Sequence, residues 1–469
     1  MAIAPTDTGA AAAAAASAVN KDQPWPSERW GFYALFCVIF ATFITFFDQT
    51  IFSMLAEKMK GSFAMSDSTL GFVLGPVSLV AYVIVGIPLA RLVDIYPRKW
   101  VLSIGIATLG SIMALGGLAQ SLGQLIGTRL FVGASSSANG PGSYSLLVDY
   151  FRPARIPLVF ALLQLGYIAG SSLGNIVGGQ MIAWTSTFPE RISFLGLSIF
   201  NWQLVLIMIG APGLLAALFY VFLKEPPRRS PPGSHQLTAP DASFGRKFAA
   251  FMGWDAAVAI WQRKHVFLPL FAALALSAVE SQGLPAWRIP FMARTYGWDE
   301  AETGALLGSL MLVSMLAGIF FGGVFVTWMG KRYKDANIRA TAIIFACTTV
   351  TTVSTPLMPT GELAVAAMAL GVFFGLAGAP AQNAAIQRIV PNEKRGQVSA
   401  LYLFMFTFFG GMGSWVIGSV STFIVGEESK VWLAILITAV VFLPTATYFM
   451  WRGIRPYREE VERLEAQGM

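Results

Sequence analysis

The chain of 469 residues has 55% hydrophobic residues and only 12% charged residues, against the roughly 25% charged residues of ordinary soluble proteins. This composition excludes a typical soluble domain and indicates a membrane protein. The net charge of +7 does not indicate nucleic-acid binding, because the basic residues fall in short clusters between apolar runs.

The chain begins with a low-complexity, alanine-rich stretch, and residues 1–29 are predicted to form a disordered tail rather than a signal peptide. Twelve apolar runs follow, each about 20 residues or longer, as a membrane-spanning helix requires. The sequence therefore predicts an all-α membrane protein with twelve transmembrane helices. The expected spans are 30–55, 69–92, 99–118, 122–148, 157–184, 202–223, 266–291, 302–328, 338–358, 362–387, 396–425 and 430–452.

The longest connection, residues 224–265, separates six spans from six and predicts an N-terminal bundle at 30–223 and a C-terminal bundle at 266–452. It opens as a proline-rich linker and continues with aromatic and basic residues, which favours an interfacial helix over a calmodulin-type target. Residues 453–469 are predicted to form a solvated cytoplasmic tail.

The distribution of lysine and arginine predicts the orientation. Of the 32 basic residues, 25 fall in segments on the side that holds both termini, six fall on the other side, and Arg129 lies within a span. Basic residues are enriched in cytoplasmic loops. We therefore expect a multi-pass protein of the cell (inner) membrane with both termini in the cytoplasm.

The two halves resemble each other in sequence. An ungapped alignment places Gly71 on Gly304, and the same offset sets Asp48 beside Ser281, one residue from Glu280. A parallel repeat of this kind predicts two pseudo-symmetric six-helix bundles that face each other across a central cavity.

Several stretches resemble a known family. The stretch "GIPLARLVDIYPRKW", through Asp94, Arg98 and Lys99, and the stretch "RLFVG", through Arg129 and Gly133, resemble signatures of the major facilitator superfamily. The stretches "PFMARTYGWDEAETG" and "IQRIVPNEKRGQVSALYLF" resemble its bacterial Spinster-like branch. The resemblance implies a secondary transporter that works by alternating access, and the branch is associated with export of lysophospholipids and sphingolipids.

Two residues depart from the pattern of that branch. Gln49 follows Asp48 where an arginine is usual, and Ser136 stands where the branch has a glutamate. The cargo is therefore open between a lysolipid or sphingoid compound and an aromatic or other organic anion. The alternatives are a proton symporter for uptake of a small organic or sugar acid, and a non-transporting sensor on the same fold.

Charged residues within the spans are the first candidates for coupling. Asp48 and Arg129 each lie seven residues from the outer end of their span, at the same depth of about 10 Å. A charge in the bilayer centre costs at least about 2.5–3.5 kcal/mol, so we expect the two to pair. Protonation of Asp48 would release Arg129; the alternative is a static pair that fixes helix packing.

Glu280 is the second candidate for proton coupling or substrate contact. It precedes Gly283 and Pro285, which can break a membrane helix and free backbone groups to line a cavity. The alternative is that Glu280 satisfies the broken backbone. Arg288 is expected to extend toward the outer membrane interface.

Other polar residues within the spans are candidates to line the cavity, although each could instead form a hydrogen bond between helices. They are Gln49, Ser136, Asn139, Gln164, Tyr167, Asn175, Gln282, Asn383 and Gln387.

The family resemblance also implies a cytoplasmic gate. Asp94 would face the positive end of the helix that follows Arg395, close to Arg98 and Lys99. Positive-inside topology is the alternative explanation for Arg98 and Lys99.

Small residues in the fifth span predict close helix packing. The stretch "GSSLGNIVGG" resembles a superfamily signature associated with antiporters. Its Gly170 and Gly174 are expected to let helices approach closely, and the stretch as a whole favours export and close contact between the two halves.

Other functional classes have no support in the sequence. Neither a histidine-rich cluster nor a phosphate-binding loop is present, and Cys37 and Cys347 have no metal-ligand spacing. No selectivity element of a channel is legible. We therefore expect no enzyme activity, no metal and no cofactor, and as partners a small-molecule or lipid-like substrate, protons and membrane lipids, with a monomeric protein and no nucleic acid.

Overall fold

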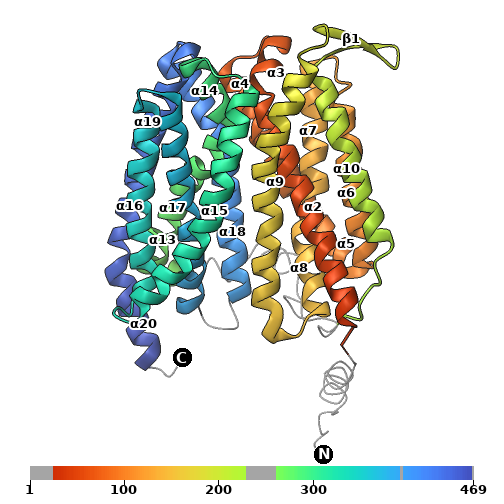
Figure 1. The fold of residues 1–469 in the computed structure, drawn as a ribbon. Coiled ribbons are helices and arrows are strands. Elements are labelled where there is room, and N and C mark those ends of the chain that lie inside the picture. Colours follow the sequence, from red (N-terminus) through yellow and green to blue (C-terminus); the bar gives the residue numbers. More distant parts are fainter. Residues whose placement is uncertain (1–24, 229–259, 391–394, 467–469) are drawn as a thin grey trace, which may run out of the picture.

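In a computed structural model, the described residues are 25–228, 260–390 and 395–466. Within them the chain forms a bundle of long helices that run roughly side by side (Figure 1). Most of the predicted tail (residues 1–29) and most of the predicted linker with its interfacial helix (residues 224–265) lie outside the described residues.

The N-terminal half of the bundle also carries a short antiparallel hairpin, which the all-α expectation did not include. Arg191 pairs with Phe200, and the turn contains Leu195 and Gly196, both with positive φ. The elements of this half are α2 (Glu28–Met54), α3 (Ala56–Phe63), α4 (Asp67–Leu74), α5 (Pro76–Ile95), α6 (Arg98–Gly116), α7 (Leu122–Ser136), α8 (Asn139–Tyr150), η1 (Pro153–Arg155), α9 (Ile156–Thr185), β1 (Arg191–Phe194), β2 (Leu197–Phe200) and α10 (Gln203–Val221).

The C-terminal half repeats the helical arrangement and ends in a helix that packs on its own half. That last helix buries Tyr457, Val461 and Leu464, so one face of the predicted solvated tail is packed. The elements are α13 (Lys264–Gly283), η2 (Leu284–Trp287), α14 (Arg288–Tyr296), α15 (Glu300–Gly330), α16 (Ala336–Ser354), η3 (Thr355–Leu357), α17 (Gly361–Ile389), α18 (Arg395–Ser419), η5 (Val420–Val425), η6 (Glu428–Lys430), α19 (Val431–Arg452) and α20 (Ile454–Ala466).

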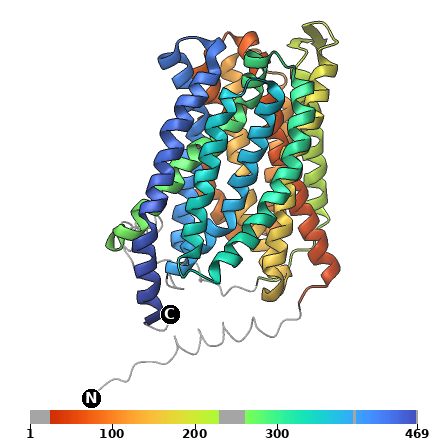
Figure 2. The same cartoon turned by 60° about the vertical axis from the view of Figure 1, so that its left-hand side comes forward.

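The two ends of the bundle carry different elements. The start of α2 and the end of α20 lie at one end, which we call the termini end (Figures 1 and 2). The β1–β2 hairpin lies at the opposite end, which we call the hairpin end.

Eleven segments of the described chain are long and apolar enough to cross a membrane. Backbone groups in lipid must be satisfied within the helix, which explains the long uninterrupted runs. The predicted span 122–148 is divided instead into α7 and α8 by a turn at Ser137 and Ala138. Pro141 contributes to this break because it has no N–H to donate to the preceding turn. Because α7 and α8 together cover that span, the described fold is consistent with the twelve-helix architecture.

The predicted break in the seventh span is confirmed. Helix α13 ends at Gly283, the 3₁₀ turn η2 contains Pro285, and α14 begins at Arg288. The break lets the chain change direction close to Glu280.

The two halves pack closely where glycines remove side chains from their seam. A Cβ atom on Gly304 would lie 2.3 Å from the carbonyl oxygen of Asn175 in α9, and a Cβ on Gly71 would lie 2.3 Å from that of Ser414 in α18. No side chain fits at such distances. Gly71 and Gly304 are the residues that the internal repeat aligns, so both halves use the same position to approach their partner.

Gly170 and Gly174 of the fifth span set close packing within the N-terminal half. A Cβ on Gly170 would lie 2.6 Å from the carbonyl oxygen of Phe43, and one on Gly174 would lie 2.9 Å from the Cβ of Thr50. Both contacts are with α2 of the same half. Gly170 and Gly174 therefore let α2 and α9 approach closely, as predicted. The contact of the same stretch with the other half is also confirmed, because a Cβ on Gly179 would lie 2.6 Å from the carbonyl oxygen of Glu300 in α15.

The buried core also distinguishes the two ends. One apolar cluster begins in the N-terminal half and continues into the C-terminal half through residues such as Trp287 and Met311. A separate cluster, with Val266 and Tyr457 among its members, belongs to the C-terminal half alone and includes α20. The continuous core thus joins the halves in the part of the bundle where η2 and α14 pack.

Candidate functional site

The charged pair predicted in the N-terminal half is present. Asp48 of α2 and Arg129 of α7 are 3% and 2% exposed, and Nη1 of Arg129 lies 3.2 Å from Oδ2 and 3.5 Å from Oδ1 of Asp48. Two helices far apart in sequence therefore bring opposite charges together in a dry environment. Whether the pair couples protons to transport stays a prediction.

The Arg129 side chain is only partly satisfied by this carboxylate. Its Nε and Nη2 are buried and have no hydrogen-bond partner among the described residues. Its Cζ lies 3.7 Å from the centre of the Phe52 ring, a cation–π contact that offsets part of the desolvation cost. Loss of the charge on Asp48 would leave Arg129 without a counter-ion, so the two charges are strongly interdependent.

Glu280 lies one residue from the position that the internal repeat aligns with Asp48, and among the described residues it has no ion-pair partner. It is 1% exposed, and both of its carboxylate oxygens lack a hydrogen-bond partner among the described residues. The nearby Thr438 hydroxyl donates to the carbonyl oxygens of Ala434 and Ile435, each at 3.0 Å. A buried carboxylate in this state is costly when charged, which favours a proton or a ligand at this position.

Arg288 turns into the bundle, which corrects the expectation that it extends to the membrane interface. Its Nη1 lies 3.5 Å from the Met311 sulfur, in the middle of α15, and its Nε is buried without a partner among the described residues. The side chain lies close enough to Glu280 and to Tyr167 to interact with them electrostatically. The helix break predicted at Gly283 could have suggested this, since it redirects the chain just before Arg288.

The predicted cavity residues fall into three groups. Ser136, Asn139 and Tyr167 are half-buried. Asn175 is buried in the seam against α15, with its amide donating to the carbonyl of Ser171 at 2.8 Å, so it is a packing residue rather than a cavity residue in this conformation. The exposed residues are Gln49, Gln164, Gln282, Asn383 and Gln387.

Arg98 of the predicted cytoplasmic gate contacts its own half. Its Nη1 lies 2.5 Å from Asp149, and its Nε donates to Glu225 at 2.9 Å. These contacts tie α6 to α8 and to the segment after α10. The backbone N–H of Lys99 also donates to Glu225, at 3.0 Å. The side chains of Asp94 and Arg395 lie outside those described, so the gate contact stays a prediction.

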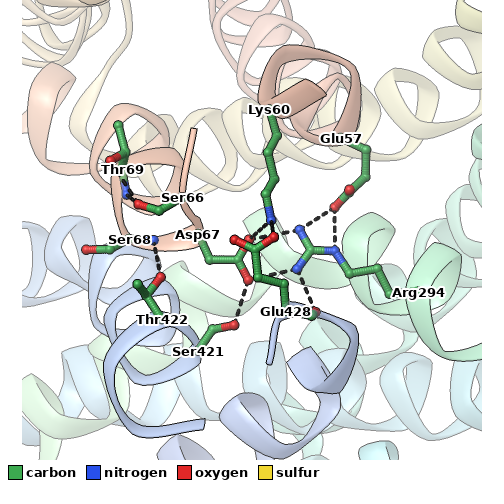
Figure 3. Close-up of polar contacts among 10 residues, drawn as sticks. All are labelled: Glu57, Lys60, Ser66, Asp67, Ser68, Thr69, Arg294, Ser421, Thr422 and Glu428. Atoms are coloured by element: carbon green, nitrogen blue, oxygen red, sulfur yellow. Dashed lines mark hydrogen bonds and ion pairs between the residues drawn. The ribbon is translucent and has the colours of Figure 1, made fainter. Parts of the chain in front are cut away.

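Sequence reasoning missed a charged cluster at the hairpin end, centred on Asp67 (Figure 3). Asp67, at the start of α4, is 0% exposed. Its Oδ1 lies 2.5 Å from Nζ of Lys60, and its Oδ2 lies 2.7 Å from Nη1 of Arg294 in α14 and accepts from Ser421 at 2.6 Å. Arg294 and Ser421 belong to the C-terminal half, so one buried carboxylate bridges the two halves.

Two further carboxylates complete this cluster. Glu57 lies 2.7 Å from Nη2 of Arg294, and Glu428 lies 2.5 Å from Nζ of Lys60, so both cations of the cluster contact both halves. We call Glu57, Lys60, Asp67, Arg294 and Glu428 the hairpin-end charge cluster. In the sequence these residues appear as scattered loop charges, and only the contact between the halves assembles them.

The described residues contain no group of three or more histidine, cysteine, aspartate or glutamate side chains arranged to hold a metal ion.

Three comparisons place these features among known proteins. The Major Facilitator Superfamily model matches residues 38–414. An MFS-type efflux pump of Mycolicibacterium smegmatis is 25% identical over 456 residues, which cover 94% of this chain and 96% of that protein. Protein spinster of Drosophila melanogaster is 22% identical over 420 residues, which cover 86% of this chain and 64% of that protein.

A solved structure agrees with the fold. The crystal structure of a bacterial homologue of the human lysosomal transporter Spinster, inward-facing and unoccupied, matches with a TM-score of 0.76 and 21% identity. The match covers 93% of this chain and 99% of that chain. The family and the fold are those of transporters rather than enzymes. The chain is therefore a multi-pass membrane protein of the Major Facilitator Superfamily, and within that superfamily it is similar to Spinster proteins.

Proposed function

We propose that this protein is a proton-coupled secondary transporter that moves an amphipathic organic solute by alternating access, with Asp48 as its main proton site. The observation that carries the proposal is the buried Asp48–Arg129 pair. Within the part of the chain that the structure describes, the guanidinium has a single carboxylate partner and two unpaired nitrogens. Protonation of Asp48 removes the only counter-ion that Arg129 has among the described residues. The energetic consequence is large because both groups are shielded from water.

Alternating access is supported by the unequal packing of the two ends. The continuous apolar core and the hairpin-end charge cluster join the halves at one end. The contacts of Arg98 at the termini end stay within one half. A transporter closed at the hairpin end would open toward the termini end, and rocking of the two halves would exchange these states.

The cavity between the halves is supported by polar side chains that are exposed within spans. Gln49 in α2, Gln164 in α9, Gln282 in α13 and Asn383 in α17 are all exposed. Polar groups in membrane helices usually face water or protein rather than lipid. We therefore assign these four residues to a wet path between the halves, with proton exchange at Glu280 as a second step.

Substrate-driven proton movement in liposomes tests the proposal. Purified protein is reconstituted with a pH dye inside, and lysolipids, sphingoid bases and aromatic or aliphatic carboxylates are added outside. Wild type is expected to move protons with at least one class, and Asp48→Asn is expected to lose that movement while still binding the solute. Glu427→Gln, an exposed carboxylate paired with Lys430, is the matched control.

Two outcomes would contradict this function. Proton movement that persists in Asp48→Asn would remove Asp48 from coupling and leave it as a structural partner of Arg129. Solute binding without movement of solute or protons in any gradient would favour the sensor alternative.

We also propose that both termini lie in the cytoplasm and that the membrane is the inner membrane. The support is the excess of basic residues on the side of the termini. A cysteine at Ser193 in the hairpin, in a chain lacking Cys37 and Cys347, is expected to react with an impermeant thiol reagent in intact cells. Reaction only after lysis would reverse the orientation.

A further inference from the structure

Arg288 has donors that the protein does not use. Its Nη1 contacts the Met311 sulfur at 3.5 Å, a weak acceptor, and its Nε is buried with no partner among the described residues. Among the described residues it forms no ion pair with Glu280 or any other carboxylate. A guanidinium remains charged inside proteins, so this cation lacks the anion that buried arginines normally have.

The position of Arg288 is at the seam between the halves. It follows η2, which packs against α2 of the N-terminal half, and it interacts electrostatically with Tyr167 of α9. The Tyr167 ring in turn meets Phe46 of α2 edge to face, with ring centres 4.6 Å apart. A cation from one half therefore lies within electrostatic range of a phenol from the other half, and that phenol packs on an apolar ring.

Two other arginines of the bundle show what is missing. Arg129 contacts Asp48, and Arg294 contacts Asp67 and Glu57. Each has a carboxylate within ion-pair distance, whereas the partner of Arg288 is a thioether. The difference indicates that the anion for Arg288 comes from outside the chain.

We propose that Arg288 and Tyr167 form the anion-binding part of the transport site and that the solute is an amphipathic monocarboxylate. This inference rests on the proposed transport function and names its substrate class.

The charge and shape of the site select this class. The nitrogens of Arg288 other than Nη1 form a planar fork that matches a carboxylate through two parallel hydrogen bonds. One guanidinium balances a single negative charge, and the nearby Glu280 disfavours a dianion such as a phosphate monoester. Phe46 and Met311 supply apolar surface for the rest of the solute. A proton on Glu280 would bind together with the solute carboxylate. The proton removes the repulsion between the Glu280 carboxylate and the solute, and the solute offsets the positive charge of Arg288 that disfavours the proton.

Binding to purified protein in nanodiscs tests this inference without transport. The probes are 4-phenylbutanoate and a panel of aliphatic monocarboxylates, each compared with its alcohol, its amine and, for the aromatic series, phenyl phosphate, by calorimetry. Wild type is expected to bind carboxylates about tenfold or more tightly than the matching alcohols. Arg288→Gln is expected to lose this preference, Arg288→Lys to keep part of it, and Tyr167→Phe to weaken it.

Arg191→Gln, in the hairpin and away from the seam, is the control, and unchanged melting temperatures show that each variant is folded. The inference is overturned if no carboxylate of the panel binds wild type better than its alcohol, if phosphate or amine probes bind better, or if Arg288→Gln keeps the carboxylate preference. Carboxylate binding that depends on Arg288 without solute-driven proton movement would uphold this site and reject the proposed coupling. Proton movement that is driven by a cationic solute and does not depend on Arg288 would uphold the proposed coupling and reject this site.

Discussion

The two halves of the bundle place a buried carboxylate at related positions and treat it differently. In the N-terminal half, Asp48 contacts Arg129 at 3.2 Å. In the C-terminal half, Glu280 has no hydrogen-bond partner among the described residues, and Arg288 contacts a thioether instead. The internal repeat therefore contains two kinds of charge pair. We call Asp48 and Arg129, which contact each other, the closed pair, and Glu280 and Arg288, which form no ion pair among the described residues, the open pair.

The difference separates charged groups that have a partner within the protein from charged groups that are left for a ligand or a proton. A closed pair fixes the charges of both residues until a proton breaks it. An open pair lowers stability unless something binds, and this is the usual cost of a preformed binding site. We therefore assign proton-dependent conformational change mainly to the N-terminal half and solute recognition mainly to Arg288 of the C-terminal half.

Breaking the closed pair should have the largest effect on stability. Arg129→Leu leaves Asp48 as an uncompensated buried charge, and we expect a loss of about 3–5 kcal/mol, measured as a lower melting temperature in detergent. The double variant Asp48→Asn with Arg129→Gln removes both charges and should recover most of this loss. A single variant as stable as wild type, or a double variant no better than the single, would show that the pair contributes little.

The same kind of change in the open pair should have the opposite sign. Glu280→Gln replaces a buried carboxylate that has no hydrogen-bond partner by a neutral group of the same shape. Since burial of a neutral amide costs less than burial of a charge, the variant should be at least as stable as wild type. Solute-driven proton movement should nevertheless fall. A stability loss comparable to that of Arg129→Leu would mean that Glu280 has a structural partner.

The sequence predicted the closed pair because both members lie within apolar runs and at equal depth, which depends only on residue spacing. It also predicted the spans, the repeat and the break after Glu280. It did not predict the inward direction of Arg288, because the rotation of α14 depends on how η2 packs against α2. The hairpin-end charge cluster was missed for a similar reason: Asp67 and Arg294 are 227 residues apart, and only the closed seam brings them together.

The hairpin-end charge cluster offers a test of how much closure depends on a pair between the halves. Asp67→Asn weakens the bonds to Lys60 and Arg294, each worth about 1.5–3 kcal/mol as a hydrogen bond to a charged group. We expect faster thiol labelling of a cysteine at Ser419, in a chain lacking Cys37 and Cys347, by roughly tenfold or more.

The control for this experiment is Glu427→Gln, because its ion pair with Lys430 is exposed and lies at the same end. Such pairs contribute about 0–1 kcal/mol, so labelling should hardly change. Equal labelling of Ser419→Cys with and without Asp67→Asn would show that the apolar core alone holds this end closed.

The smallest effect is expected for a carboxylate that is fully paired outside the spans. Asp335 lies 3.0 Å from Arg339 and 2.7 Å from Arg458 of α20. Burial raises the pKa of Asp335, but the hydrogen bonds from Arg339 and Arg458 outweigh it and hold the pKa below its ordinary value. Because the folded protein has the lower pKa, the stabilisation is fully present above the unfolded pKa of about 3.9 and is lost as the pH falls through the folded value.

The melting temperature of Asp335→Asn should therefore lie below that of wild type at neutral pH, and the two should converge as the pH falls below about 4. Lys334→Gln, whose exposed partner is Glu465, serves as the control and should differ little from wild type at any pH. A gap between Asp335→Asn and wild type that stays constant into acid would mean that Asp335 acts by its shape and neutral hydrogen bonds. Its charge would then contribute nothing to the fold, unlike the charge of Asp48 in its pair with Arg129.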